Sequence, residues 1–279
     1  MHKIDSILDN IKNLPPAPQV LPKLLSALTE ADSDVDRVVD LIALDPAMTA
    51  KLLQTCNSAF YGMDSPVNDT AEAVNRLGFQ LVYRTVATVS AAHCLKVSPA
   101  SGLDAGQFWK HSVITAFAAQ YIAEGVDADA GLHFTAALLH DLGKVVLAEG
   151  FGKHYNELLV ASADSFRLSL EKAAYGADHA EVGARLLERW KFSPALLNAV
   201  RYHHDPAVAG DWKRSAACIC LANALAHNLD QSPAGHKSPI NAPDSALNIL
   251  NVTPDDLDRH RVLIIENWHF VEGMCQLQS

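Results

Sequence analysis

Hydrophobic positions recur with helical spacing along nearly the whole chain, and the alternation typical of strands is scarce. In the apolar segment 108–124, for example, Val113, Phe117 and Tyr121 follow one another at four-residue steps. Side chains three or four residues apart share one face of an α-helix, so each such segment presents an apolar stripe to a core. The pattern predicts an all-α protein.

Capping residues mark where these helices begin, because a short polar side chain or a first-turn proline fits a helix start. The predicted starts are Asp45-Pro46, Asp69 with Glu72, Asp178 with Glu181, Ser193-Pro194 and Thr253-Pro254. Further helices are predicted over residues 79–96, 133–148 and 213–228. The helix after Ser193 is expected to run to His204, residues 231–244 to form a loop, and the helix after Thr253 to be the last.

Small, polar and turn-forming residues interrupt the helical pattern over residues 97–106, VSPASGLDAG. We place a boundary there, between an N-terminal helical lobe (residues 1–100) and a second helical lobe (residues 101–279). The expected architecture is two-lobed, with the N-terminal bundle packed on the second lobe. The segment after the last motifs is expected to close the second lobe, and a homodimer contact through it is left open.

Composition narrows the classes of partner. Lys and Arg total 22 against 32 Asp and Glu, a formal net charge of −10, so the basic face that a nucleic-acid binder needs is not expected. No apolar run reaches the roughly 20 residues of a membrane span, and the N-terminus lacks the apolar core of a signal peptide. The five cysteines are odd in number and form no CxxC pair. We therefore expect a cytoplasmic protein with reduced, mostly buried thiols and neither nucleic acid nor membrane as a partner.

The first lobe shows no catalytic constellation. Asp45, Asn57 and Ser58 are polar residues within apolar sequence. We interpret them as capping and turn residues, with a binding role as the alternative. Phe60 and Tyr61 are expected to pack between the lobes.

The second lobe concentrates histidines on apolar helix faces. A lone histidine is more often structural, but a set on facing helices favours a metal site, because a buried imidazole needs a partner and neutral imidazole is a good metal ligand. The candidate ligands are His111, His140, Asp141, His179, His203 and His204. His140 and Asp141 end the run FTAALLHD, and His203 and His204 close the helix that begins after Ser193.

This ordered set, H…HD…H…HH, resembles the HD superfamily of metal-dependent phosphohydrolases over about residues 106–230. The resemblance implies that the six side chains hold one or two divalent ions (Fe, Mn, Zn or Mg), and that a metal-activated water attacks a phosphoester. It also implies catalytic roles for Asp141 and for Lys144 of HDLGK, which matches a phosphate-holding lysine.

More specific segments resemble the HDOD family within that superfamily. They are LPPAP (14–18), DPAMTAKLLQTCNSAFYG (45–62), AVNRLG (73–78), GADHAEVGARLLERW (176–190) and AVRYHHDP (199–206). The resemblance implies a bacterial, all-helical protein with an N-terminal lobe and a degenerate HD lobe. It implies a signal-transduction output module, mostly without catalysis, that acts on a protein partner.

Two departures from an active HD enzyme bear on function. Asn223 stands where the final metal-binding aspartate is expected, and a neutral amide is the weaker ligand. The residues after His204, DPAVAG, lack the GYP signature of cyclic-dinucleotide phosphodiesterases. The sequence therefore favours a regulatory module whose HD pocket binds a metal or a small ligand such as a nucleotide or phosphorylated molecule. The alternative is a metal-dependent phosphohydrolase.

Overall fold

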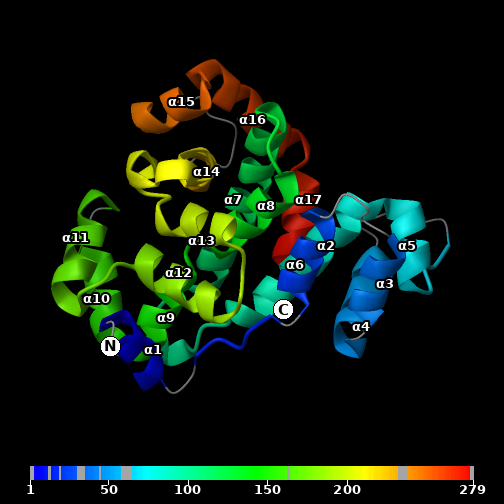
Figure 1. Ribbon diagram of the computed structural model, residues 1–279, viewed down its shortest axis with the longest axis horizontal. Coiled ribbons are helices and arrows are strands. Elements are labelled where there is room, and N and C mark those ends of the chain that lie inside the picture. The colour runs from blue at the N-terminus through cyan, green and yellow to red at the C-terminus, as the bar shows by residue number, and fades with distance from the viewer. Residues whose placement is uncertain are drawn as a thin grey trace.

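The computed structural model describes residues 3–11, 14–18, 20–29, 35–43, 45–57, 65–161, 164–231 and 238–276. Within these ranges the regular structure is entirely helical, as predicted, and Figure 1 shows no strand among them. None of the described helices combines the length and the apolar character needed to cross a bilayer.

The helices before residue 100 form the part of the molecule at the right of Figure 1, except for the first of them. They are α1 (Lys3–Asn10), α2 (Leu21–Thr29), α3 (Val35–Ala43), α4 (Pro46–Cys56), α5 (Thr70–Leu77) and α6 (Phe79–Cys94). Asp45 caps α4 by accepting the backbone N–H of Met48 at 3.1 Å. The Asn57 amide pairs with both backbone groups of Val67, at 2.8 and 2.6 Å. Both residues thus serve the capping and turn roles predicted for them, whereas Ser58, Phe60 and Tyr61 lie outside the described residues.

The later helices surround the long, almost wholly buried α7, which packs on α8 and α14. These helices are α7 (Ala105–Gly125), α8 (Ala130–Leu139), α9 (Leu142–Phe151), α10 (Lys153–Ala161), α11 (Asp164–Tyr175), α12 (His179–Arg189), α13 (Pro194–Arg201), α14 (Lys213–Gln231), α15 (Asp244–Leu250), α16 (Pro254–Glu266) and α17 (Trp268–Cys275). Short 3₁₀ turns occur at η1 (Pro99–Ser101), η2 (Pro206–Val208) and η3 (Gly210–Trp212). The predicted caps at Asp178, Ser193 and Thr253 are all present.

The structure corrects three of the predicted helices. The helix expected over residues 133–148 is two helices, α8 and α9, separated at His140 and Asp141. The helix expected to reach His204 ends at Arg201, and α17 follows the helix that was expected to be the last. The imidazole Nδ1 of His140 bonds the carbonyl of Ala137 at 2.7 Å, so a side chain occupies the acceptor that a continuing helix would use. His203 and the carbonyl of Val200 repeat this contact at 2.7 Å.

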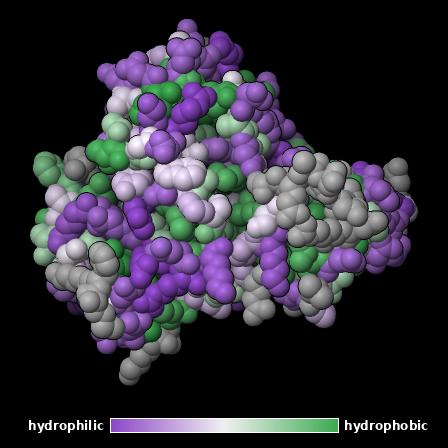
Figure 2. Space-filling view, in the orientation of Figure 1, coloured by the Kyte–Doolittle hydropathy of each residue, from purple (hydrophilic) through white to green (hydrophobic). Residues whose placement is uncertain are grey.

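The first helix, α1, packs against α12 and α9, which follow it by more than 130 residues in the sequence (Figure 1). Asp5 accepts from Arg185 at 2.8 and 3.0 Å and from Arg189 at 2.9 Å, and Arg189 also pairs with Asp9 at 2.8 Å. The bonds from the two arginines lower the pKa of Asp5. Figure 2 shows hydrophilic side chains gathered over α1 and α12 on this face. The boundary near residue 100 stays a prediction.

The cysteines are free thiols, as expected, and four of the five are buried. Burial raises the pKa of Cys56 to about 11, and that of Cys94 and of Cys220 to about 12. A thiol reacts as its thiolate, so these side chains behave as small apolar residues at neutral pH.

Candidate metal centre

Breaks and starts of helices bring the predicted ligands together. His140 and Asp141 form the junction of α8 and α9, His179 is the first residue of α12, and His203 and His204 lie in the turn after α13. Ring centroids are 5.0 Å apart for His140 and His203, and 5.8 Å apart for His179 and His203. His111 on α7 lies 5.5 Å from His140 by the same measure. The structure thus gathers the six predicted ligands side by side, as two groups whose ligand atoms lie within 4.8 Å of one another: His111, His140 and Asp141, and His179, His203 and His204.

Three of the histidines are oriented alike. Nδ1 of His140 and Nδ1 of His203 each bond a backbone carbonyl, and Nδ1 of His179 bonds the Glu171 carboxylate at 2.7 Å. A neutral ring that donates from Nδ1 has its lone pair on Nε2. Nε2 of His140, Nε2 of His203 and Oδ1 of Asp141 are buried and have no hydrogen bond of good geometry to a described residue. Their nearest polar contacts are long: Nε2 of His140 lies 3.3 Å from Asp141 Oδ2, and Asp141 Oδ1 lies 3.3 Å from Nε2 of His179. Orphaned buried atoms are costly, and a divalent ion is a partner that suits nitrogen and carboxylate ligands. The donor set therefore fits a metal.

The charges in the cluster agree with this fit. Burial lowers the pKa of His140 and holds that of His203 well below its usual range, so both rings are in the neutral form that binds metals. Burial alone would raise the pKa of Asp141, but His140 and Lys144 outweigh it and hold that pKa well below its usual range. Lys144 Nζ donates to Asp141 Oδ2 at 2.5 Å. One oxygen of the carboxylate is therefore occupied by a lysine, and the other faces the histidines.

Two glycines allow this half of the cluster to assemble. A Cβ on Gly143 would lie 1.9 Å from the carbonyl oxygen of His179 and 2.8 Å from the backbone nitrogen of Gly183. Helices α9 and α12 therefore cross with their backbones in contact, directly behind Asp141 and His179. Only glycine permits this approach, because the opposing atoms belong to the backbone and cannot rotate away.

A buried carboxylate that sequence reasoning missed supports His179. Glu171, on α11, is fully buried, and its Oε2 accepts from both the backbone N–H and Nδ1 of His179, at 2.7 Å each. Its other oxygen accepts from the buried Tyr155 hydroxyl at 2.8 Å. Such carboxylates orient a ligating imidazole and make it more basic. The sequence did contain a signal for this residue: Glu171 lies at helical spacing between Leu168 and Tyr175, so an acidic residue falls on an apolar helix face.

The other side of the cluster is arranged differently. Nε2 of His111 lies 3.0 Å from the Asn223 side-chain oxygen, and Nδ1 lies 2.8 Å from Asp230 Oδ2. Asn223 thus faces the cluster, but it contacts His111. The His227 ring lies beside His111, with centroids 4.5 Å apart and the two planes tilted by 36°. Asp230 and His227 were not singled out from sequence, although Asn223, His227 and Asp230 follow the i, i+4, i+7 spacing of one face of α14.

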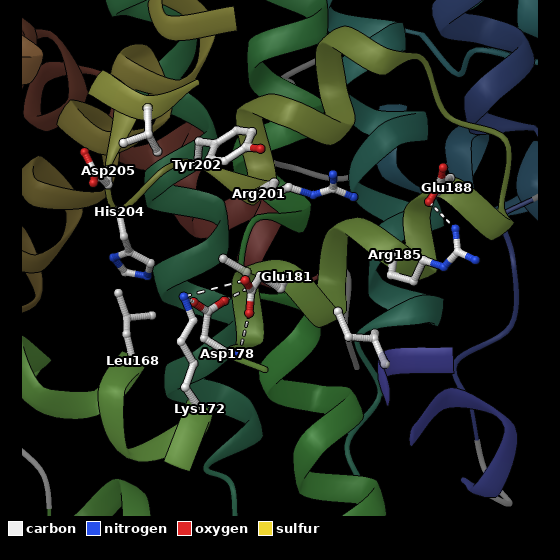
Figure 3. Close-up of a pocket in the computed structure, with 13 residues that line it drawn as sticks. Leu168, Lys172, Asp178, Glu181, Arg185, Glu188, Arg201, Tyr202, His204 and Asp205 are labelled. Atoms are coloured by element: carbon white, nitrogen blue, oxygen red, sulfur yellow. Dashed lines mark hydrogen bonds and ion pairs between the residues drawn. The ribbon is translucent and has the colours of Figure 1, made fainter. Parts of the chain in front are cut away.

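A cavity of ≈ 690 Å³ adjoins the cluster at His204, which is the exposed member (Figure 3). Nε2 of His204 lies 2.9 Å from Nε2 of the buried His179. Lys172 pairs with Asp178 at 3.0 Å and with Glu181 at 3.6 Å, so its charge is balanced. Arg201 also lines the cavity and makes no ion pair with any described residue. A ligand in this cavity would meet one unpaired guanidinium and the edge of the histidine cluster.

The sequence model of the HDOD domain matches residues 14–206 of the 279. The chain belongs to the HDOD family. A protein of Treponema pallidum (strain Nichols) with no assigned activity is 29% identical over 234 residues, which are 81% of this chain and 44% of that protein. Ribonuclease Y of Opitutus terrae is 32% identical over 95 residues, 34% of this chain and 13% of the enzyme. The chain thus spans less than half the length of these curated relatives.

Solved structures agree with the fold. A protein of Shewanella amazonensis SB2B, named as a candidate phosphohydrolase, has a TM-score of 0.73 at 25% identity, covering 98% of each chain. An HDOD domain protein of Geobacter sulfurreducens has a TM-score of 0.73 at 22% identity, covering 99% of this chain and 96% of the other. A candidate signal transduction protein of Marinobacter aquaeolei VT8 has a TM-score of 0.76 at 21% identity, covering 99% and 65%. The last two matches carry the fold alone.

Proposed function

We propose that this HDOD protein is a signal-transduction output module whose HD pocket binds a divalent metal ion. The observation that carries the proposal is two groups of ligand atoms, each within 4.8 Å of one another: one from His111, His140 and Asp141, the other from His179, His203 and His204. Among them, Nε2 of His140, Nε2 of His203 and Oδ1 of Asp141 are buried without a hydrogen-bond partner among the described residues. His179 and His204 would complete the ligand set, and His111 would join it through Nε2 once Asn223 releases that nitrogen. A bound ion would supply a Lewis acid and would join the α8–α9 junction, the start of α12 and the turn after α13.

Regulation is favoured over turnover by the contacts of two residues. Lys144 takes one oxygen of Asp141, which reduces the negative charge that the carboxylate offers to an ion. Asn223 supplies a neutral amide in place of a carboxylate and holds Nε2 of His111. Both contacts weaken a centre that must activate a reactant, while leaving ligands that can hold an ion. A protein partner in the cytoplasm belongs to the same proposal, since family membership supports an output role.

The proposal is tested by metal analysis of protein purified without chelator. We expect bound Fe, Mn or Zn in the unaltered chain and its loss in His140→Ala and in His203→Ala. His133→Ala is the matched control, because His133 is also buried but lies outside the cluster. Its Nδ1 also bonds a backbone carbonyl, that of Asp129, at 2.6 Å. Equal metal content in all four proteins would sink the inner site.

A second candidate function is metal-dependent phosphohydrolysis. It is favoured by the cavity that His204 and Arg201 both line, where Arg201 makes no ion pair with any described residue. Arg201 would bind an anionic phosphate there, and Lys144 would neutralise negative charge beside Asp141. Generic phosphomonoesters, phosphodiesters and nucleotides are the substrates to screen. Turnover that disappears in a double His140→Ala, Asp141→Ala variant and falls in Arg201→Ala supports catalysis. Turnover that survives the double variant belongs to a contaminant.

A further inference from the structure

A second group of potential metal ligands lies on the α7–α14 side of the protein. We call it the outer cluster and define it by His111, His227 and Asp230. One ligand atom from each lies within 4.8 Å of those from the other two. His227 and Asp230 are three residues apart on α14, so they project from the same face of that helix toward His111 on α7.

Accessibility distinguishes the outer cluster from the buried centre around His140. The Asp230 side chain is 18% exposed and His227 is half-buried, whereas His140 is 0% exposed. An ion can therefore reach the outer cluster from solvent, and a coordination position remains for water. Two imidazoles and one carboxylate form a nitrogen-rich set that suits zinc and neighbouring transition metals better than magnesium or calcium.

The contacts of His111 require either a second ring proton or a bound cation between His111 and Asp230. A neutral imidazole carries one N–H, yet both ring nitrogens of His111 face oxygen acceptors, at 2.8 Å from Asp230 and 3.0 Å from Asn223. When Nε2 donates to the Asn223 oxygen, the Nδ1 lone pair faces the Asp230 carboxylate. In the metal-free protein a second ring proton satisfies this arrangement, and a metal ion bound by both atoms would replace that proton, with His227 beside it as a further ligand.

We propose that His111, His227 and Asp230 form a second, surface-accessible transition-metal site, distinct from the HD centre. The site shares His111 with that centre. An ion on Nδ1 requires the proton on Nε2, where Asn223 accepts it, and this removes His111 from the inner ligands. An ion on Nε2 requires Nδ1–H, which Asp230 then accepts. Each tautomer of His111 serves one site, so occupancy of the outer cluster weakens the sixth ligand of the inner centre.

The test is a Zn²⁺ titration of the full chain by equilibrium dialysis, with Co²⁺ absorption spectra as a second readout. We expect His227→Ala and Asp230→Ala each to lower bound Zn²⁺ by about one equivalent per chain, and to change the Co²⁺ spectrum. His140→Ala and His203→Ala should leave that equivalent in place. His93→Ala, an exposed helical histidine outside both clusters, is the matched control and should bind as the unaltered chain does.

The outcomes separate this site from the inner one. Loss of an equivalent in the outer variants, with none lost in the inner variants, supports the outer site and rejects the inner. Loss in the inner variants alone overturns the outer site. A protein that binds no Zn²⁺ or Co²⁺ rejects both. To exclude misfolding, each variant is compared by circular dichroism and by its thermal midpoint without metal. His227→Gln, which keeps a polar side chain of similar size beside α7 but removes the imidazole, repeats the measurement with a milder change.

Discussion

The two sides of the histidine cluster treat the same kind of ligand differently. On the α9–α12–α13 side, Nε2 of His140 and Nε2 of His203 have no hydrogen-bond partner among the described residues, and the Nδ1 atoms of both rings are fixed by backbone carbonyls. On the α7–α14 side, both nitrogens of His111 are engaged, by Asn223 and by Asp230. A histidine in the right place is therefore not yet an inner ligand, because the hydrogen bonds around it decide which nitrogen is available.

The first side is also the more rigid. The α9–α12 crossing fixes Asp141 against His179 at backbone contact, and the fully buried Glu171 holds His179 from behind. The second side depends on the half-buried α14 residues His227 and Asp230. We therefore expect metal binding in the HD pocket to depend mainly on the first side, and the following changes measure how much.

The largest effect is expected for Gly143→Ala. The added methyl carbon would overlap the His179 backbone, so α9 and α12 must separate, with a loss of about 3 kcal/mol or more in the free energy of unfolding. Metal binding should fall with it. The matched control is Gly106→Ala, also the second residue of a helix, where the new carbon meets only Asp104 Oδ1 at 3.5 Å. This control should change stability by no more than about 1 kcal/mol in urea unfolding. Equal losses in both variants would contradict the tight crossing.

Glu171→Gln is expected to weaken metal binding by about 10- to 100-fold while leaving most of the fold intact. The amide keeps one acceptor for His179 but removes the charge that makes the imidazole basic. Zn²⁺ competition against a chromophoric chelator measures the change. Glu181→Gln is the control, since Glu181 caps the same helix start from the solvent side. An unchanged dissociation constant for Glu171→Gln would show that the His179 side does not depend on this carboxylate.

Asn223→Asp should make the α7–α14 side of the cluster bind metal more like the α9–α12–α13 side. A carboxylate beside His111 adds an anionic ligand, and we expect metal to bind about tenfold more tightly, equivalent to about 1.4 kcal/mol. The same competition assay applies, with Asn198→Asp on α13 as the control for added charge. Weaker binding in Asn223→Asp would mean that the amide, through its contact with His111, already favours the metal-bound state.

The smallest effect is expected at the α1 contact. Arg185 and Arg189 lower the pKa of Asp5 in the folded protein, so their ion pairs stabilise the fold above the pKa of an unfolded aspartate, roughly 3.9. That contribution is lost as the pH falls from there toward the folded pKa. Asp5→Asn should therefore reduce stability slightly at neutral pH and flatten the acid dependence between about pH 4 and pH 2. Asp211→Asn, at an exposed position without an ion pair to a described residue, should do neither.

Metal affinity should be unchanged in Asp5→Asn at neutral pH. The ion pairs between Asp5 and the two arginines lie on the solvent side of α12. His179 instead contacts α9 and the buried Glu171. A fall in affinity would show that the first side of the cluster depends on α1 as well.

Much of the fold followed from local pattern. Helical spacing, the caps at Asp45, Asp178 and Ser193, and the histidines on apolar faces all depend on residues close together in sequence, and the structure has them as predicted. The helix breaks at His140 and after Arg201 did not follow, because both sequences continue an apolar helical pattern. The breaks arise where an imidazole bonds the carbonyl three residues earlier, a choice that depends on burial among other helices.

The sequence by itself determined the candidate ligands of this protein: His111, the His140-Asp141 pair, His179 and the His203-His204 pair, with Asn223 in place of an aspartate. The tertiary structure decided what each of them can do. It set the contacts of Glu171 and Asp230, which lie 8 and 119 residues from the histidines that they bond. It also decided that Asn223 engages His111. Spacing along a helix fixes the face on which a side chain lies, but the atoms that it meets belong to other helices, and only their packing selects them.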